Sequence, residues 1–173
     1  MQGCRPTDLP PGVFLERYDQ PGMYTDCFRL DVPRAVDLCG FISAFYTTPL
    51  FKMERGLLKL GRLGATDEQA RALARGELDR FAAWTVEDRD ERQLLMCDVR
   101  GLTRSWLMCE PDAKGTALFF GSAVVPKASG DSERGELGLF FKLTLGAHKK
   151  YSVALLNAAG RALMKDAGAV QTP

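Results

Sequence analysis

Residues 80–125 of the chain read RFAAWTVEDRDERQLLMCDVRGLTRSWLMCEPDAKGTALFFGSAVV. Four segments within this stretch alternate apolar and polar side chains, roughly 80–87, 92–100, 103–111 and 116–125. Alternation with a period of two is typical of a half-buried β-strand. Apolar residues then recur at helical spacing over about 147–167. The stretch therefore predicts an antiparallel meander that leads into a long C-terminal helix.

Upstream segments complete the predicted order of elements. Residues 24–32 alternate like the meander and predict a first strand. Pro33 is expected in the first turn of the helix that follows, whose apolar face comprises Leu38, Phe41, Ile42 and Phe45. A capping box at 66–69 predicts another short helix. Residues 136–145 fit either a fifth meander strand or a helix, and the helix, with a kink near Gly146, is favoured.

The length of 173 residues indicates one domain. Residues 1–22 are expected to form an irregular N-terminal arm with a short extended piece at 13–18. Residues 23–168 form the single predicted domain, and residues 169–173 a tail.

The composition narrows the function classes. A net charge of +1 gives no electrostatic reason to expect nucleic acid as a partner. No apolar run approaches the ~20 residues that a membrane-spanning helix needs, and the N-terminus lacks a signal-peptide profile. A cytoplasmic location is therefore expected.

Cysteine and histidine usage argues against a metal or cofactor. The five cysteines form no C-x-x-C pair, and the chain has one histidine. We expect free thiols that behave as small apolar residues, no metal site and no cofactor.

The turns at 89–90, 101–102 and 111–115 set the registers of the meander, and each register assigns every side chain to a face. One predicted face receives Ala82, Trp84, Val86, Leu95, Cys97, Val99, Arg104, Trp106, Met108, Leu118, Phe120 and Ser122. The opposite face receives Phe81, Ala83, Thr85, Leu94, Met96, Asp98, Ser105, Leu107, Cys109, Ala117, Phe119 and Gly121. The first face is the bulkier, so it is expected to be concave and to lie against the C-terminal helix.

Several apolar positions carry a resemblance to a known superfamily. They are Trp84, Leu94-Leu95, Ser105-Trp106-Leu107, Phe119-Phe120-Gly121-Ser122, and His148 with Tyr151, Leu155 and Leu156. Over roughly residues 80–165 the chain resembles the START-like superfamily of polyketide cyclases and lipid-transfer proteins, and within it an uncharacterised bacterial family.

The resemblance implies an α+β helix-grip fold, in which a curved antiparallel sheet wraps a long C-terminal helix. Short helices separate the first strand from the meander. Only five or six strands can be counted here, fewer than a helix-grip sheet commonly has. The arm or residues 137–145 supply another strand, or the sheet is reduced. Superfamily members commonly hold apolar or amphipathic molecules between helix and sheet, and they share no set of catalytic residues.

Arg104 and Ser122 are the most specific candidates for binding chemistry, because the predicted registers place them almost opposite each other. A buried guanidinium needs a partner. That partner is a ligand carboxylate or phosphate, or Asp26 on the first strand; alternatively, Arg104 reaches solvent at the end of the sheet.

His148 and Tyr151 are candidates for proton transfer. A lone histidine acts as a general base only with an orienting partner and a group to activate. The alternatives are a capping or surface role for His148 and core packing for Tyr151.

The sequence thus predicts a protein that binds a small apolar or amphipathic molecule between its sheet and C-terminal helix. The predicted ligand-binding residues are Asp26, Trp84, Arg104, Trp106, Met108, Phe120, Ser122 and Tyr151, and no catalytic residue is assigned. One alternative is a cyclase- or hydrolase-type enzyme that uses Asp26, His148 or Tyr151 in the same cavity. The other is a ligand-free interaction module whose convex patch around Leu94, Met96 and Leu107 is covered by another protein or by a second copy in a homodimer.

Overall fold

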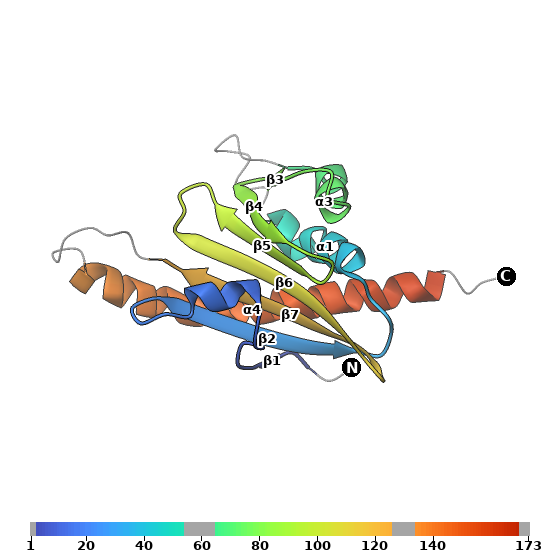
Figure 1. Ribbon diagram of the computed structural model, residues 1–173, viewed down its shortest axis with the longest axis horizontal. Coiled ribbons are helices and arrows are strands. Elements are labelled where there is room, and N and C mark those ends of the chain that lie inside the picture. The colour runs from blue at the N-terminus through green and yellow to red at the C-terminus, as the bar shows by residue number, and fades with distance from the viewer. Residues whose placement is uncertain (1–2, 54–64, 126–133, 170–173) are drawn as a thin grey trace.

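The computed structural model describes residues 3–53, 65–125 and 134–169. The fold is α+β, with one curved antiparallel sheet in the order β1-β2-β7-β6-β5-β4-β3 (Figure 1). The strands are β1 (Arg5–Pro6), β2 (Tyr24–Val32), β3 (Arg80–Phe81), β4 (Trp84–Arg89), β5 (Gln93–Asp98), β6 (Thr103–Asp112) and β7 (Gly115–Val124). The helices are the 3-10 helix η1 (Phe14–Tyr18), α1 (Leu38–Tyr46), α3 (Asp67–Ala74) and α4 (Arg134–Ala169). Residues 49–53 are also helical.

The strand count exceeds the five or six read from the sequence for two local reasons. β1, from the arm, pairs with β2 through Arg5 and Arg29. The segment 80–87 is not one strand, because Ala82 adopts a positive φ of 52° and the chain turns there between β3 and β4. The arm therefore supplies an edge strand, and residues 136–145 do not: they belong to α4.

The predicted first strand and the helix at Leu38 are confirmed, but the start of that helix differs. Pro33 lies outside it. α1 begins at Leu38 because the Asp37 carboxylate accepts a hydrogen bond from the Gly40 amide at 2.7 Å. The capping box of α3 forms as expected. In the C-terminal region, α4 runs without interruption through Gly146, and residues 170–173 of the expected tail lie outside the described residues.

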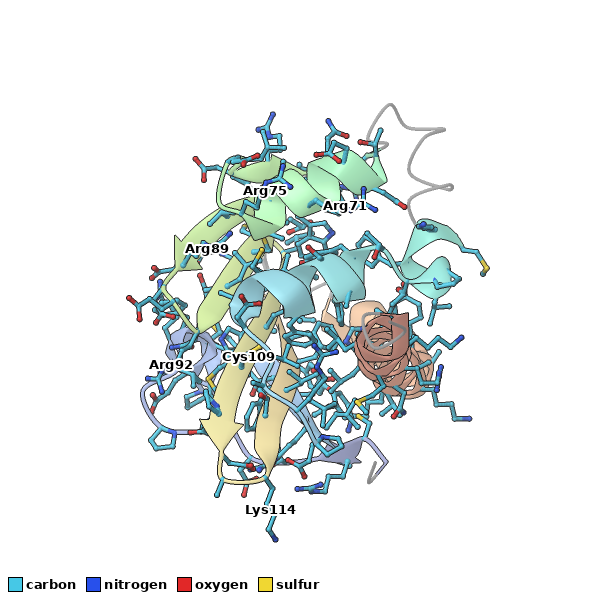
Figure 2. All side chains as sticks on the ribbon, turned by 90° about the vertical axis from the view of Figure 1, so that its right-hand side faces the viewer. Arg71, Arg75, Arg89, Arg92, Cys109 and Lys114 are labelled. Carbon is cyan, nitrogen blue, oxygen red and sulfur yellow. The ribbon has the colours of Figure 1, made fainter. Side chains whose placement is uncertain are left out.

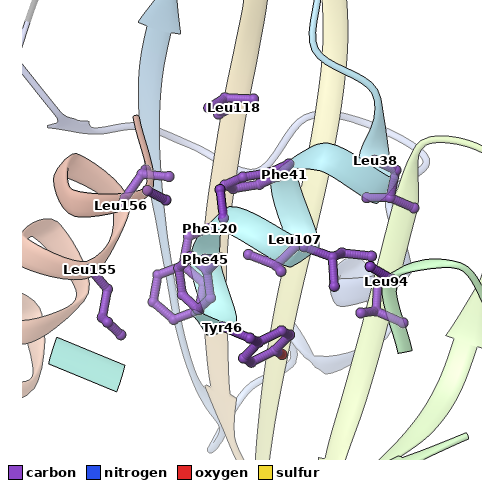
Figure 3. Close-up of a cluster of buried hydrophobic side chains, with 14 of the residues drawn as sticks. Leu38, Phe41, Phe45, Tyr46, Leu94, Leu107, Leu118, Phe120, Leu155 and Leu156 are labelled. Atoms are coloured by element: carbon purple, nitrogen blue, oxygen red, sulfur yellow. The ribbon is translucent and has the colours of Figure 1, made fainter. Parts of the chain in front are cut away.

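Both faces of the sheet are covered. The helices α1, α3 and α4 lie on one face, and η1 lies on the other; Figure 2 shows α1 and α4 together on their side of the sheet. α4 packs against α1, β2 and β7, while α1 packs on β6. The core between sheet and helices includes Phe28, Leu30, Leu94, Met96, Leu107, Leu118, Phe120, Leu155 and Leu156 (Figure 3). The smaller core under η1 includes Leu15, Cys27, Leu95, Trp106, Met108 and Phe119.

Two of the three predicted registers assign side chains to the wrong face, one along part of the strand pair and the other along its whole length. Between β4 and β5, Arg89 pairs with Leu94, which keeps the predicted faces near the turn, but a bulge between Val86 and Asp88 reverses them for Trp84–Val86. Between β6 and β7, Asp112 pairs with Gly115, so the loop has two residues. The β5–β6 register preserves the predicted faces, because Leu95 lies opposite Trp106.

These slips split the predicted concave face. Trp84 packs in the core on the helix side, whereas Trp106 is fully buried on the η1 side. Arg104 pairs with Ala123, and Ser122 pairs with Ser105, so Arg104 and Ser122 project from opposite faces. The predicted convex patch also fails, since Leu94, Met96 and Leu107 are fully buried on the helix side.

The arm is more ordered than predicted. Residues 14–18 form η1 rather than an extended piece, and Leu15 is fully buried against the sheet. Cys27 and Cys109 are buried and, like the other three cysteines, have free thiols. Burial raises the pKa of both Cys27 and Cys109 to about 12. The two thiols therefore stay neutral and pack as apolar groups, as expected from the sequence.

Candidate functional site

A pocket of about 240 Å3 lies on the helix side of the sheet, where β6 begins and β7 ends. α1 and α4 form its walls. Its apolar lining comprises Phe45, Tyr46, Phe51, Trp84, Phe120 and Leu155, and its polar side chains are Thr103, Ser105, Ser122, His148 and Tyr151. The sequence predicted a space between sheet and C-terminal helix, and the structure adds α1 as a third wall.

The apolar walls consist mainly of aromatic side chains that come from α1, from residues 49–53 and from strands β4 and β7. The ring centroids of Phe45 and Phe120 are 4.9 Å apart, which joins α1 to β7. Tyr46 and Phe51 meet edge to face at 4.9 Å. Leu155 of α4 lines the same pocket and belongs to the same buried cluster as Phe45 (Figure 3). Rings of this kind suit a flat apolar molecule.

Asp26, Ser122 and His148 form a chain of polar groups at one end of the pocket. The Ser122 hydroxyl donates to Oδ1 of Asp26 at 2.6 Å, and Nε2 of His148 lies 2.9 Å from the same hydroxyl oxygen. Nε2 is also 3.7 Å from Oδ2 of Asp26. Since the Ser122 proton is directed to Asp26, the hydroxyl oxygen accepts from His148, which places a proton on Nε2.

The fold brings these three residues together from distant parts of the sequence. Asp26 and Ser122 are directly paired across β2 and β7, so their side chains share the helix face. α4 crosses both strands and carries His148 above them. One turn later, the Ser152 hydroxyl donates to the carbonyl of His148 at 3.0 Å.

The Asp26 carboxylate is the buried member of the chain, with a side-chain exposure of 7%, against 41% for His148. It accepts three hydrogen bonds: from the backbone amide and hydroxyl of Ser122, and from the Tyr24 hydroxyl at 3.0 Å. Burial, the negative charge of Asp26 and the hydrogen bond to it raise the pKa of Tyr24. Tyr24 therefore remains a donor, and three donors together with His148 stabilise the carboxylate.

The arrangement differs from that of a serine nucleophile. In a serine hydrolase, the histidine accepts the serine proton at one nitrogen and donates to the carboxylate from the other. Here Asp26 takes the Ser122 proton directly, and both residues meet His148 at Nε2. Ser122 thus links two ionisable groups, and of these two it is His148 that lines the pocket.

Five of the predicted ligand-binding residues belong to this site. Trp84, Phe120, Ser122 and Tyr151 line the pocket, and Asp26 lies directly behind Ser122. Two others do not: Trp106 and Met108 are buried on the η1 face, where the indole N–H of Trp106 donates to Gln93 at 3.0 Å. The cause is the one-residue slip between β6 and β7.

Arg104 borders the pocket, but the register Arg104–Ala123 directs its side chain to the opposite face of the sheet from Ser122. Its guanidinium lies on the η1 side, where Nε is 2.5 Å from a Glu87 carboxylate oxygen and Cζ is 4.6 Å from the Tyr18 ring centroid. The predicted partner Asp26 instead meets His148. Of the alternatives drawn from the sequence, an internal ion pair applies, but with Glu87 as the acid.

Sequence reasoning missed the contribution of α1 and the following turn. Phe45 was predicted only as part of the apolar face of a helix, and Tyr46 and Phe51 were not singled out. The available signal was the density of aromatic residues over 41–51. His148, treated as either a general base or a surface group, proves to have the orienting partner that a base requires.

A larger hollow of about 580 Å3 at Asp37–Cys39 and Arg89–Glu91 is open to solvent and bordered mainly by charged residues. It lacks the enclosing rings of the smaller pocket. Over the described ranges, no group of three or more His, Cys, Asp or Glu side chains is placed to hold a metal ion.

Comparisons with known proteins add no family assignment. No protein-family model matches the chain, and no curated protein is significantly similar to it. Among the described residues, none of the helices combines the length and apolar character needed to span a bilayer.

Proposed function

We propose that the protein binds a small apolar or amphipathic molecule in the pocket between β6, β7, α1 and α4. The observation that carries this proposal is an aromatic pocket of about 240 Å3 that ends in the Asp26–Ser122–His148 chain. Apolar walls with a few convergent polar groups are the usual features of small-molecule sites. An apolar ring would contact the aromatic walls, and a polar group would reach His148.

The fold proposed for this function is a helix-grip variant of the START-like type. Support comes from the element order, a strand followed by short helices, a meander and a long C-terminal helix, and from the packing of α4 on β2 and β7. The contribution of α1 to the pocket is a departure from a simple grip, in which sheet and C-terminal helix alone enclose the ligand.

The test is thermal unfolding in the presence of single-ring compounds such as toluene and p-cresol. A ligand present at ten times its Kd stabilises the native state by about 1.4 kcal/mol, which corresponds to a rise in Tm of about 3–6 °C for a domain of this size. In the variant Ser105→Phe, a ring added inside the pocket should abolish that rise. Glu110→Phe adds the same ring at an exposed position of β6 and should leave it intact.

If no ring compound raises Tm in the wild type, or if Ser105→Phe responds as the wild type does, the pocket is not a binding site.

A second candidate function is proton transfer at the same pocket, and the contacts of His148 favour it. The imidazole lines the pocket, and Asp26 at 3.7 Å can stabilise the positive charge that forms when the ring accepts a proton. A suitable reaction transfers a proton from a carbon next to a ketone to the imidazole; the imidazolium exchanges its proton with the solvent and then returns a solvent-derived proton to the carbon. Exchange of the α-hydrogens of cyclohexanone in D2O, followed by NMR, measures this step.

If the protein catalyses this exchange, we expect a rate about 10²–10⁴-fold above that in the absence of the protein. The variant His148→Gln, which keeps a polar group beside Ser122, should lose the acceleration. Equal rates for the wild type and His148→Gln would remove the enzymatic candidate and leave binding alone.

A further inference from the structure

The ionic groups near the polar end of the pocket compensate each other. Asp26 has a nearly buried carboxylate, and among the described residues the group within ion-pair distance that can carry a positive charge is the His148 imidazole, at 3.7 Å. A protonated His148 and Asp26 together carry no net charge. A ligand carboxylate placed beside this pair would meet the negative charge of Asp26 as well as the imidazolium.

Arg104, the arginine that could have neutralised an anionic ligand, forms an ion pair with another residue. The Arg104 guanidinium pairs with Glu87 on the opposite face of the sheet and lies over the Tyr18 ring. Lys149, next to His148, is exposed, and its Nζ lies 5.9 Å from the Tyr24 ring centroid, outside the pocket lining. No lysine or arginine side chain in the described part of the chain therefore supplies a positive charge inside the pocket.

The hydrogen-bond chain defines the polar group that His148 can receive. The contacts of its side chain with the described residues run through Nε2, so Nδ1 is the ring nitrogen left for a ligand. In the neutral ring Nδ1 accepts a hydrogen bond, and in the protonated ring it donates one. A hydroxyl group satisfies both states, because it is a donor and an acceptor.

The pocket volume limits the size of the apolar part of the ligand. A cavity of about 150 Å3 holds benzene, and drug-sized ligands occupy pockets of about 300 Å3 or more. The volume of about 240 Å3 lies between these limits. One aromatic ring with a small substituent matches it.

We infer that the pocket selects an uncharged, single-ring hydroxy compound of the phenol class, with its ring among Phe45, Phe120 and Trp84 and its hydroxyl on His148. This inference rests on the proposed function and specifies its ligand class. It attributes the selection against anions to Asp26.

The experiment compares three matched probes by calorimetric titration: toluene, p-cresol and 4-methylbenzoate. The wild type should bind p-cresol about tenfold more tightly than toluene, as expected for one additional hydrogen bond, and should bind 4-methylbenzoate most weakly. In Asp26→Asn, which keeps the shape and an acceptor for Ser122, affinity for 4-methylbenzoate should rise about tenfold, because removal of the carboxylate leaves His148 free to pair with an anion.

Asp88→Asn is the matched control, because it changes the net charge equally at a partly exposed site that pairs with Arg17 on the η1 side. It should reproduce the wild-type order of affinities. If 4-methylbenzoate binds the wild type as tightly as p-cresol, or if toluene and p-cresol bind equally, the inference is wrong while the binding function stands. If none of the three probes binds, the proposed function fails and the inference fails with it. The wild-type comparison decides the matter even if Asp26→Asn does not fold.

Discussion

Replacement of Trp106 by alanine is expected to lower the free energy of unfolding by about 3–5 kcal/mol, the usual cost of deleting a buried indole. Trp106 is fully buried between β6 and η1, and its N–H donates to Gln93. The variant should nevertheless bind a ring compound with wild-type affinity at temperatures where it is folded, because Trp106 lies across the sheet from the pocket. Urea denaturation and calorimetric titration measure the two quantities.

Trp84→Ala provides the reciprocal measurement. Trp84 is only partly buried and lines the pocket, so its removal should cost less stability, about 1–2 kcal/mol, and weaken ligand binding. If Trp106→Ala abolishes binding in a folded protein, or if Trp84→Ala leaves binding unchanged, the ligand does not bind on the Trp84 side of the sheet as proposed.

Gly115→Ala should be at least as disruptive, with a loss of about 3–5 kcal/mol of unfolding free energy or failure to fold. Gly115 has a φ of 148°, and a Cβ there would lie 2.1 Å from the Val32 carbonyl oxygen and 2.6 Å from the Arg34 nitrogen. Both obstacles are backbone atoms, so no side-chain movement relieves the overlap. Relief requires separation of β7 from the end of β2.

Gly101→Ala measures the cost of a positive φ without a steric overlap, so the difference between the two variants gives the steric part. Gly101 also has a positive φ, 72°, but a Cβ there meets nothing within 4 Å. Its substitution should cost only about 1–2 kcal/mol of backbone strain. Denaturation midpoints of the two variants give the comparison, and similar midpoints would show that the close approach at Gly115 is unimportant.

The order of elements was predictable because each relies on local signals. The alternation over 24–32, the capping box at 66–69 and the turns of the meander act over a few residues, and they led to elements that the structure confirms. The count of seven strands was not predictable, because the chain turns at Ala82 with a positive φ. A positive φ is uncommon for alanine, so the sequence gives no signal of a turn there.

The assignment of faces failed for a physical reason visible in the chain itself. The pairs Leu94-Leu95 and Phe119-Phe120 place an apolar side chain on each side of the sheet, and the structure buries both members of each pair. When both faces are covered, alternation no longer distinguishes the pocket side from the other, and only the loop geometry sets the register. A bulge after Val86 and a two-residue loop before Gly115 then decided the outcome.

The candidate site could be predicted only in part for the same reason. Asp26, Trp84, Phe120, Ser122 and Tyr151 were singled out, but Arg104 was expected where His148 now meets Asp26. That contact joins β2 to α4 across more than a hundred residues, and no local pattern reports it.

The position of β7 also has a dynamic consequence. This strand is bonded to β2 and β6 along its length, covered by α4 on one face and by η1 on the other. Backbone amides in such a place exchange with solvent only in the largest opening events. Ser122 therefore sits on a rigid platform, whereas its partner His148, with a side chain that is 41% exposed, lies where solvent reaches it directly.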